Sequence, residues 1–150
     1  AKSMIRDNGP GMLFLPVKMM KEVKAHVDLD QCMPLNKAVV LHRASDSSVA
    51  AGKAVTVLTY LHGVRESEKA IELVKAQNPD ADIELIELRS LKPLDIDTIR
   101  QSLQRTHKVA ILDESTLSGG VGATISSLIA EKCYFELDAP VRRLSMDDAP

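Results

Sequence analysis

The chain has 150 residues, of which 45% are hydrophobic and 27% are charged, and its formal net charge at pH 7 is -2. A chain of this size buries roughly two-thirds of its unfolded surface, so it can form a core without disulfides or bound metal. The small net charge provides no basic field for nucleic acid, and no apolar run approaches the roughly 18 residues of a membrane span. We therefore expect neither nucleic acid nor a membrane as a partner.

The cysteines and the ends of the chain suggest its context. Cys32 and Cys133 lie far apart, outside any C-x-x-C or Cys/His ligand spacing, so we expect reduced, packed thiols. The chain starts at Ala1 and stops at Pro150, each close to a predicted strand. We therefore expect it to be a piece of a longer polypeptide.

The first third of the chain gives weak structural signals. Met12 to Leu15 predicts a short strand that Pro16 closes or confines to a sheet edge. Residues 18–27 have little periodicity and predict a surface connection. Lys37 to Arg43 predicts the next strand, and the small, polar residues from Ala44 to Lys53 predict a long loop.

From Ala54 onward the pattern is regular. The run from Ala54 to Tyr60 is β-branched and predicts a strand, and Val64 to Ala76 predicts a helix with Glu/Lys pairs three residues apart. Asp82 to Leu88 predicts another strand. After a crossover, Asp95 is the expected N-cap of a helix that has its apolar residues on one side: Ile96, Ile99 and Leu103.

The stretch from Val109 to Ile129 organises the rest of the prediction. Four apolar residues from Val109 to Leu112 predict a strand buried on both faces, and a glycine-rich turn then leads into a helix for which Ser118 is the candidate N-cap. Val141 to Met146 predicts the last strand. Strands alternating with helices predict an α/β fold of three layers (αβα) with a mostly parallel sheet and right-handed crossovers.

The turn residues Gly119, Gly120 and Gly122 suit either a phosphate cradle or a packing joint. A dinucleotide fingerprint needs G-x-G-x-x-G and an acidic residue at the end of the next strand. Here the pattern is G-G-x-G, the P-loop lysine is missing, and Asp138 precedes the next strand. These departures favour a structural turn and leave anion binding as the alternative.

Residues with acid–base or ligand chemistry are scattered. We interpret His26, His42 and His62 as surface or hydrogen-bonded histidines, and His107, which precedes the central strand, is the best candidate of the four. Asp113 and Glu114 follow that strand at the sheet edge where open α/β folds place ligands, yet a solvated carboxylate fits them better than a general base. The carboxylates of Asp28 and Asp30 lack a third ligand at calcium-loop spacing. We assign no catalytic, cofactor-binding or metal-binding residue.

Five short runs carry a resemblance in the correct order: Met33–Ala38, Thr56–Tyr60, Leu88–Asp95, Gly119–Ala123 and Leu137–Pro140. Together they resemble the β subunits of the thiamine-dependent decarboxylating component of pyruvate dehydrogenase, the plastid and bacterial forms most. The resemblance implies that residues 1–35 are the tail of a pyrimidine-binding domain plus linker. Residues 36–150 would be a transketolase C-terminal-like domain, truncated at its end.

The resemblance also implies a function for the whole enzyme. Such an enzyme is an α2β2 heterotetramer that uses thiamine diphosphate and Mg2+ to convert pyruvate, the product of glycolysis, toward acetyl-CoA. Both cofactors would be bound mainly outside this chain. The glutamate that activates thiamine lies in the preceding domain, so this chain alone is expected to be inactive.

The implied partners are the α subunit, a second β subunit and the subunit-binding domain of the dihydrolipoyl acyltransferase. The aspartate of the Leu-Asp-Ala-Pro motif, here Asp138, takes part in that docking; a simple turn aspartate is the alternative. The implied compartment is the plastid stroma or the bacterial cytoplasm, with the mitochondrial matrix as the alternative. The chain has Leu15-Pro16 where relatives commonly have Glu-His, which removes two polar groups near the interdomain region.

Rival functions stay open. The branched-chain 2-oxo acid dehydrogenase β subunit has similar features, although Gly122-Ala123 and Asp138 favour the pyruvate enzyme. A non-catalytic assembly module and nucleotide binding at the glycine turn are the rivals of other classes.

Overall fold

The computed structural model describes residues 2–17, 30 and 32–148. The predicted surface connection 18–27, which contains His26, and the carboxylate of Asp28 lie outside the described residues. None of the helices in the described part combines the length and the apolar character that crossing a bilayer requires. The elements are, in chain order, α1 (Lys2–Arg6), β1 (Val39–His42), α3 (Asp46–Ala50), β2 (Ala54–Thr59), α4 (His62–Gln77), β3 (Asp82–Glu87), α5 (Ile96–Thr106), β4 (Val109–Thr116), α6 (Val121–Lys132), η1 (Tyr134–Glu136) and β5 (Arg142–Met146).

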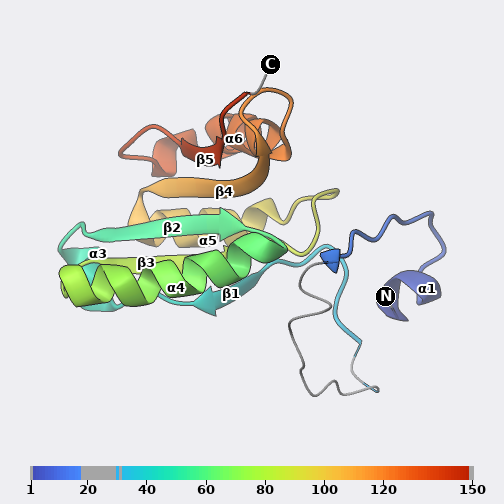
Figure 1. Ribbon diagram of the computed structural model, residues 1–150, viewed down its shortest axis with the longest axis horizontal. Coiled ribbons are helices and arrows are strands. Elements are labelled where there is room, and N and C mark those ends of the chain that lie inside the picture. Colours follow the sequence, from blue (N-terminus) through green and yellow to red (C-terminus); the bar gives the residue numbers. More distant parts are fainter. Residues whose placement is uncertain (1, 18–29, 31, 149–150) are drawn as a thin grey trace.

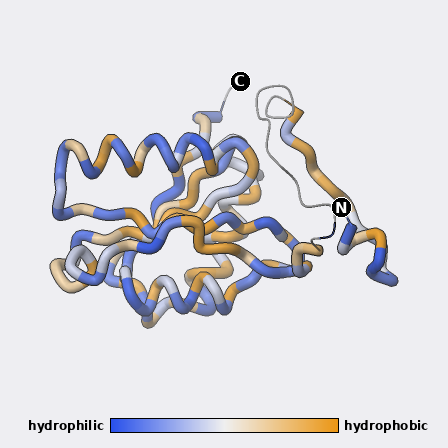
Figure 2. Tube along the Cα trace, turned by 90° about the horizontal axis from the view of Figure 1, so that it is seen from below, coloured by the Kyte–Doolittle hydropathy of each residue, from blue (hydrophilic) through white to orange (hydrophobic). Residues whose placement is uncertain are grey.

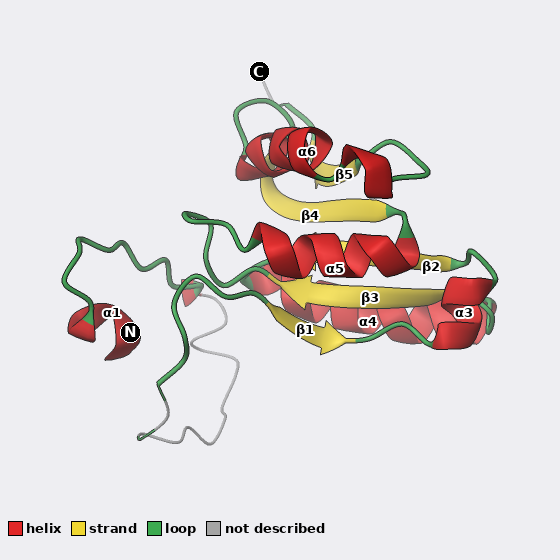
Figure 3. Cartoon of the chain, turned by 180° about the vertical axis from the view of Figure 1, so that it is seen from behind, coloured by secondary structure: helices red, strands yellow, loops and turns green. Residues whose placement is uncertain are grey.

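The strands form a mostly parallel sheet in the order β1-β3-β2-β4-β5 (Figure 1). The pairs β2/β3, β2/β4 and β4/β5 are parallel, and β1 pairs with β3 in the antiparallel direction. Helix α4 covers one face, and α5 and α6 cover the other (Figures 1 and 3). The predicted αβα fold with a mostly parallel sheet is therefore confirmed.

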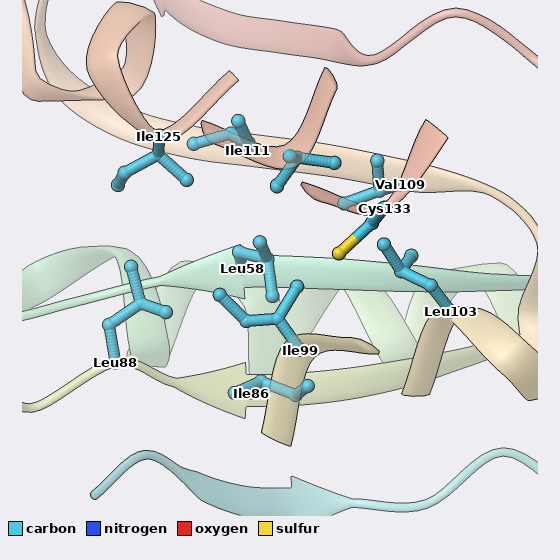
Figure 4. Packing of buried hydrophobic residues seen from close by; sticks show 10 residues of the cluster. Leu58, Ile86, Leu88, Ile99, Leu103, Val109, Ile111, Ile125 and Cys133 are labelled. Carbon is cyan, nitrogen blue, oxygen red and sulfur yellow. The ribbon is translucent and has the colours of Figure 1, made fainter. Parts of the chain in front are cut away.

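The main core lies between the sheet and the layer of α5 and α6. It consists of wholly or almost wholly buried side chains from these elements and from the residues directly after β3 and α6: Leu58, Ile86, Leu88, Ile99, Leu103, Val109, Ile111, Ile125, Ile129 and Cys133 (Figure 4). Figure 2 shows the same arrangement: hydrophobic segments lie in the middle of the fold, and the helices around them alternate between hydrophobic and hydrophilic residues. This packing fixes the positions of the loops that follow β2 and β4.

Two predictions in the first third of the chain are wrong. Met12 to Leu15 is not a strand, because these exposed residues have no neighbouring strand in the described part of the chain with which to form a hydrogen-bonded ladder. The predicted loop from Ala44 to Lys53 contains α3, whose N-cap Ser45 accepts a 3.4 Å hydrogen bond from the Ser48 amide. The cysteine prediction holds for Cys133, which is buried, but Cys32 is exposed.

Asp82, at the start of β3, joins three elements. Its buried carboxylate accepts hydrogen bonds from the Ser45 amide at 3.0 Å and the Ile83 amide at 2.9 Å. It also lies 3.0 Å from His42 Nε2 and 3.3 Å from Lys75 Nζ. Burial raises the pKa of Asp82, but these bonds outweigh burial and lower it to about 2.

This depressed pKa predicts a pH-dependent loss of stability. Because the folded pKa is below the unfolded value of about 4, the ionised carboxylate contributes about 2 kcal/mol that is present above pH 4 and is lost as the pH falls through 2. Asp82→Asn should therefore lower the unfolding free energy at pH 7 by about 2 kcal/mol, and the gap to the wild type should shrink toward pH 2. Urea unfolding at several pH values measures this gap.

Asp80→Asn is the matched control, because the Asp80 side chain is 72% exposed. We expect a small effect from this surface substitution. A gap for Asp82→Asn that stays constant from pH 7 to pH 2 would contradict the assigned role of its ionised form.

Candidate functional site

The carboxyl ends of β2 and β4 bring Tyr60 and Asp113 together. Asp113 is only 3% exposed, and its carboxylate accepts hydrogen bonds from Tyr60 Oη at 2.5 Å and Gly122 N at 2.7 Å. Ser115 donates two more, from its hydroxyl at 2.5 Å and its amide at 3.1 Å. All four donors are supplied by this chain, so the carboxylate is fully engaged inside the fold.

These contacts also determine the charge states at the strand ends. Burial raises the pKa of Asp113, but the hydrogen bonds from Ser115, Tyr60 and Gly122 outweigh it and hold the pKa below its usual value. The pKa of Tyr60 is raised by burial and by the hydrogen bond to Asp113. Asp113 is therefore an ionised acceptor with little basicity, which makes it a poor general base.

The glycine turn packs directly against this carboxylate. A Cβ at Gly120 would lie 2.5 Å from the Thr116 carbonyl oxygen, and one at Gly122 would lie 2.8 Å from Asp113 Oδ2. Gly119 adopts a φ of +74° with open space around it. The turn therefore has two positions where side chains clash and one that needs a left-handed backbone.

The prediction that Ser118 caps α6 is wrong. Gly120 is the N-cap, and the Ser118 amide and hydroxyl instead donate to the Asp148 carboxylate at 2.9 and 2.5 Å. At the helix start, the Gly122 amide already binds the anionic Asp113 side chain. This arrangement favours the packing joint over an anion cradle.

The described residues do not fit thiamine diphosphate or Mg2+. The helix N-terminus that would hold a diphosphate is occupied by Asp113. Within residues 2–17, 30 and 32–148, no group of three His, Cys, Asp or Glu side chains is arranged to hold a metal ion.

A shallow groove of about 400 Å3 runs along the carboxyl ends of β4 and β5 beside the start of α4. Leu144 and Met146 form its apolar side, and His62 and Glu114 contribute polar groups. The His62 Nδ1 atom is buried and has no hydrogen-bond partner among the described residues, and its Nε2 lies 3.8 Å from Glu66 Oε1, which is too long for a good hydrogen bond. Among the described histidines, His62 is the one that the fold brings near Asp113 and Glu114, which the sequence pattern did not indicate.

His107 has a structural position at the end of α5. It adopts a left-handed φ of 56°, and its Nδ1 lies 3.0 Å from the Glu136 carbonyl oxygen. Its own carbonyl accepts a 2.9 Å hydrogen bond from the Asp138 amide. His107 thus ties the loop that carries Asp138 to the core, away from the groove.

Asp138 presents an exposed carboxylate on this tied loop. Its backbone amide is held by His107, but its side chain makes no hydrogen bond or ion pair with any described residue. The sequence motif indicated this residue, and the fold leaves its charge available.

Curated relatives match almost the whole chain. The pyruvate dehydrogenase E1 component subunit beta of Porphyra purpurea is 38% identical over 149 residues, which cover 99% of this chain and 42% of the relative. The protein of the same name from Cyanidium caldarium is 38% identical over 154 residues, with the same two coverages. The relative from Arabidopsis thaliana, named as chloroplastic, is 34% identical over 152 residues and is covered to 34%. The chain thus spans less than half the length of these curated relatives.

A solved structure and a family model agree with the fold. A split-gene transketolase, described as an inactive beta4 tetramer, superposes with a TM-score of 0.65 at 20% identity, over 85% of this chain and 38% of that one. At this identity the likeness establishes the fold alone. Residues 47–150 match the family described as the transketolase C-terminal domain. The chain therefore belongs to the transketolase C-terminal domain family.

Proposed function

We propose that the chain is the C-terminal portion of the β subunit of a plastid pyruvate dehydrogenase, where it supports assembly and docking rather than supplying catalytic groups. The similarity to the named β subunits over 99% of the chain supports this assignment. In the complete enzyme, pyruvate would be decarboxylated and its acetyl group passed to a dihydrolipoyl acyltransferase on the way to acetyl-CoA. Thiamine diphosphate and Mg2+ would be held mainly by other parts of the enzyme.

The observation that carries the docking role is the free carboxylate of Asp138. Its loop is held by hydrogen bonds to His107, so the side chain is presented from a fixed position. Asp113 lies among internal donors and offers no comparable charge to a partner. An anionic group held in place on the surface suits fast, specific association with a basic partner such as the subunit-binding domain.

The uncovered side of β4 and β5 supports the assembly role. Leu144 is 54% exposed and Met146 is 60% exposed, and both line the groove beside α4. Exposed apolar side chains that line a groove are suited to burial in an interaction surface. The α subunit and a second β subunit are the partners that we propose for such surfaces of the chain.

The domain boundary follows from the same proposal. Residues 1–35 would complete the pyrimidine-binding domain and its linker, and residues 36–150 would form the C-terminal domain. The glutamate that activates thiamine would lie in the preceding domain, so the chain alone would not decarboxylate pyruvate.

The test uses the complete β subunit assembled with its α subunit. We expect Asp138→Asn to weaken binding of the acyltransferase's subunit-binding domain by about 10- to 100-fold, because the variant removes a charge that complements a basic partner. Thiamine-dependent decarboxylation of pyruvate, followed with an artificial electron acceptor, should stay unchanged.

Asp97→Asn is the matched control for this test. Asp97 is also exposed, and it lies at the start of α5, about 15 Å along the helix from the end that holds the Asp138 loop. Unchanged binding by Asp138→Asn would contradict the docking role. Preferential turnover of a branched-chain 2-oxo acid would assign the chain to the branched-chain 2-oxo acid dehydrogenase. If neither substrate were turned over, the chain would be assigned as a non-catalytic assembly module.

A further inference from the structure

Two aromatic side chains project into solvent just before Asp138. Phe135 is 97% exposed and Tyr134 is 68% exposed, although the chain contains only two phenylalanines and two tyrosines. Their rings meet edge to face with centroids 5.5 Å apart. Two adjacent exposed aromatic rings offer a large apolar area that a partner could bury, and interfaces are enriched in such side chains.

The pair stands on a fixed platform. Cys133, directly before η1, is wholly buried in the core between the sheet and the layer of α5 and α6 (Figure 4). Arg100 donates to the Lys132 carbonyl oxygen at 2.5 Å and lies 3.5 Å from Glu136 Oε1. His107 is hydrogen-bonded to the Glu136 carbonyl, so the segment is held on both sides. Because its backbone is already fixed, binding of a partner to the two rings would cost little further backbone entropy.

The aromatic pair lies close to Asp138 because only a few residues separate them. Four residues of extended chain span at most about 14 Å, so Tyr134 and Phe135 lie within that reach of Asp138. A standard interface covers about 800 Å2 on each partner, which corresponds to a disc of about 16 Å radius. A partner centred on Asp138 would therefore also reach the aromatic pair.

The charges of the segment indicate the chemistry of that partner. Glu136 is paired with Arg100, whereas Asp138 has no ion-pair partner among the described residues. Cations lie favourably over the faces of tyrosine and phenylalanine rings, and exposed aromatic residues are typical energetic anchors of interfaces. The segment from Tyr134 to Asp138 thus combines two exposed rings with one free carboxylate, which suits a protein module rich in arginine or lysine.

We infer that Tyr134 and Phe135 are the aromatic anchors of the docking surface around Asp138, and that they bind a small basic protein module. The inference rests on the proposed function, because the occupant is the module that Asp138 would bind. It adds that the two rings contribute affinity of their own, whereas Asp138 supplies charge and orientation.

The experiment measures binding of the recombinant subunit-binding domain to the assembled enzyme by calorimetry. We expect Phe135→Ser and Tyr134→Ser each to weaken binding by about 10- to 30-fold, with Phe135→Trp close to the wild type. High salt should weaken the wild type but have less effect on Asp138→Asn, in which the charge is already absent. Leu73→Ser is the matched control, since Leu73 is 63% exposed but lies on α4, on the opposite face of the sheet from α5 and α6, against which η1 packs (Figure 3).

The outcomes separate the inference from the function on which it rests. No binding by the wild type would overturn the docking role itself. Binding that depends on Asp138 but not on the two rings would overturn the inference and leave the docking role intact. Unchanged affinity of the Phe135→Ser enzyme together with a smaller assembly in sedimentation would show that the ring lies in a subunit contact. Unchanged affinity together with lower unfolding stability would show that the ring stabilises the fold. Either result would also overturn the inference.

Discussion

Gly120→Ala is expected to lower the unfolding free energy of the domain by about 3 kcal/mol, because the new methyl group has no space. Its Cβ would overlap Ser115 Oγ and would lie 2.5 Å from the Thr116 backbone oxygen. The hydroxyl of Ser115 can rotate away only by giving up its hydrogen bond to Asp113. The backbone oxygen can move only if β4 moves, so the substitution destabilises the packing between β4 and α6. Urea unfolding monitored by circular dichroism measures the change.

Gly119→Ala in the same turn separates crowding from backbone conformation. Gly119 has a φ of +74° and open space around its Cβ position, so this variant should cost about 1 kcal/mol through the left-handed backbone alone. Gly120 has a φ of -70° and a ψ of 157°, which any residue adopts, so its cost arises from contacts only. Equal effects at the two positions, or a Gly120→Ala variant as stable as the wild type, would contradict the packing joint.

Arg105→Met is expected to lower the unfolding free energy by about 3 to 5 kcal/mol, because it leaves a buried carboxylate without its closest charged partner. Glu84 is wholly buried, with its Oε2 atom 3.5 Å from Arg105 Nε. Arg105 also donates to the Ala44 carbonyl oxygen at 3.0 Å, so its loss detaches α5 from the segment before α3. After the substitution, the described ion-pair partner of Glu84 is Arg43 at 3.9 Å.

Two further variants test the origin of this effect. Glu84→Gln combined with Arg105→Met should recover part of the lost stability, since the amide carries no charge to bury. Arg43→Met should cost less than about 1 kcal/mol, because the Arg43 side chain is 57% exposed and its contact is long. Additive effects of Glu84→Gln and Arg105→Met would show that the two groups do not interact.

Elements with clear local signals could be predicted from the sequence. The β-branched run in β2, the spaced Glu and Lys of α4 and the Asp95 cap of α5 are all local patterns, and the structure contains each of them. Asp95 accepts the Thr98 amide at 3.3 Å, as a capping aspartate should. The three-layer order followed from the alternation of these elements.

Features that depend on distant residues could not be predicted in the same way. The antiparallel direction of β1 is decided by its pairing with β3, and nothing in four residues of strand encodes a direction. Tyr60 and Asp113 are 53 residues apart, so the hydrogen bond that engages the Asp113 carboxylate was invisible until the strands were placed. Helix α3 was missed although Ser45 and Gly52 are a local cap and stop, because its small polar residues also suit a loop.

The candidate docking surface combines both kinds of information. Asp138 was indicated by its motif, whereas the exposure of the adjacent aromatic pair is a property of the fold. Aromatic residues next to a buried cysteine would ordinarily be predicted to share its core. The short η1 turn instead directs Tyr134 and Phe135 outward, away from the cluster that holds Cys133.

The most direct measurement is the affinity of the assembled enzyme for the acyltransferase's subunit-binding domain, compared between the wild type and Asp138→Asn and paired with the rate of pyruvate decarboxylation. We expect the variant to bind about 10- to 100-fold more weakly and to decarboxylate at the wild-type rate. If the variant bound normally but lost decarboxylation, Asp138 would be required for catalysis, and the docking function proposed for this part of the β subunit would be contradicted.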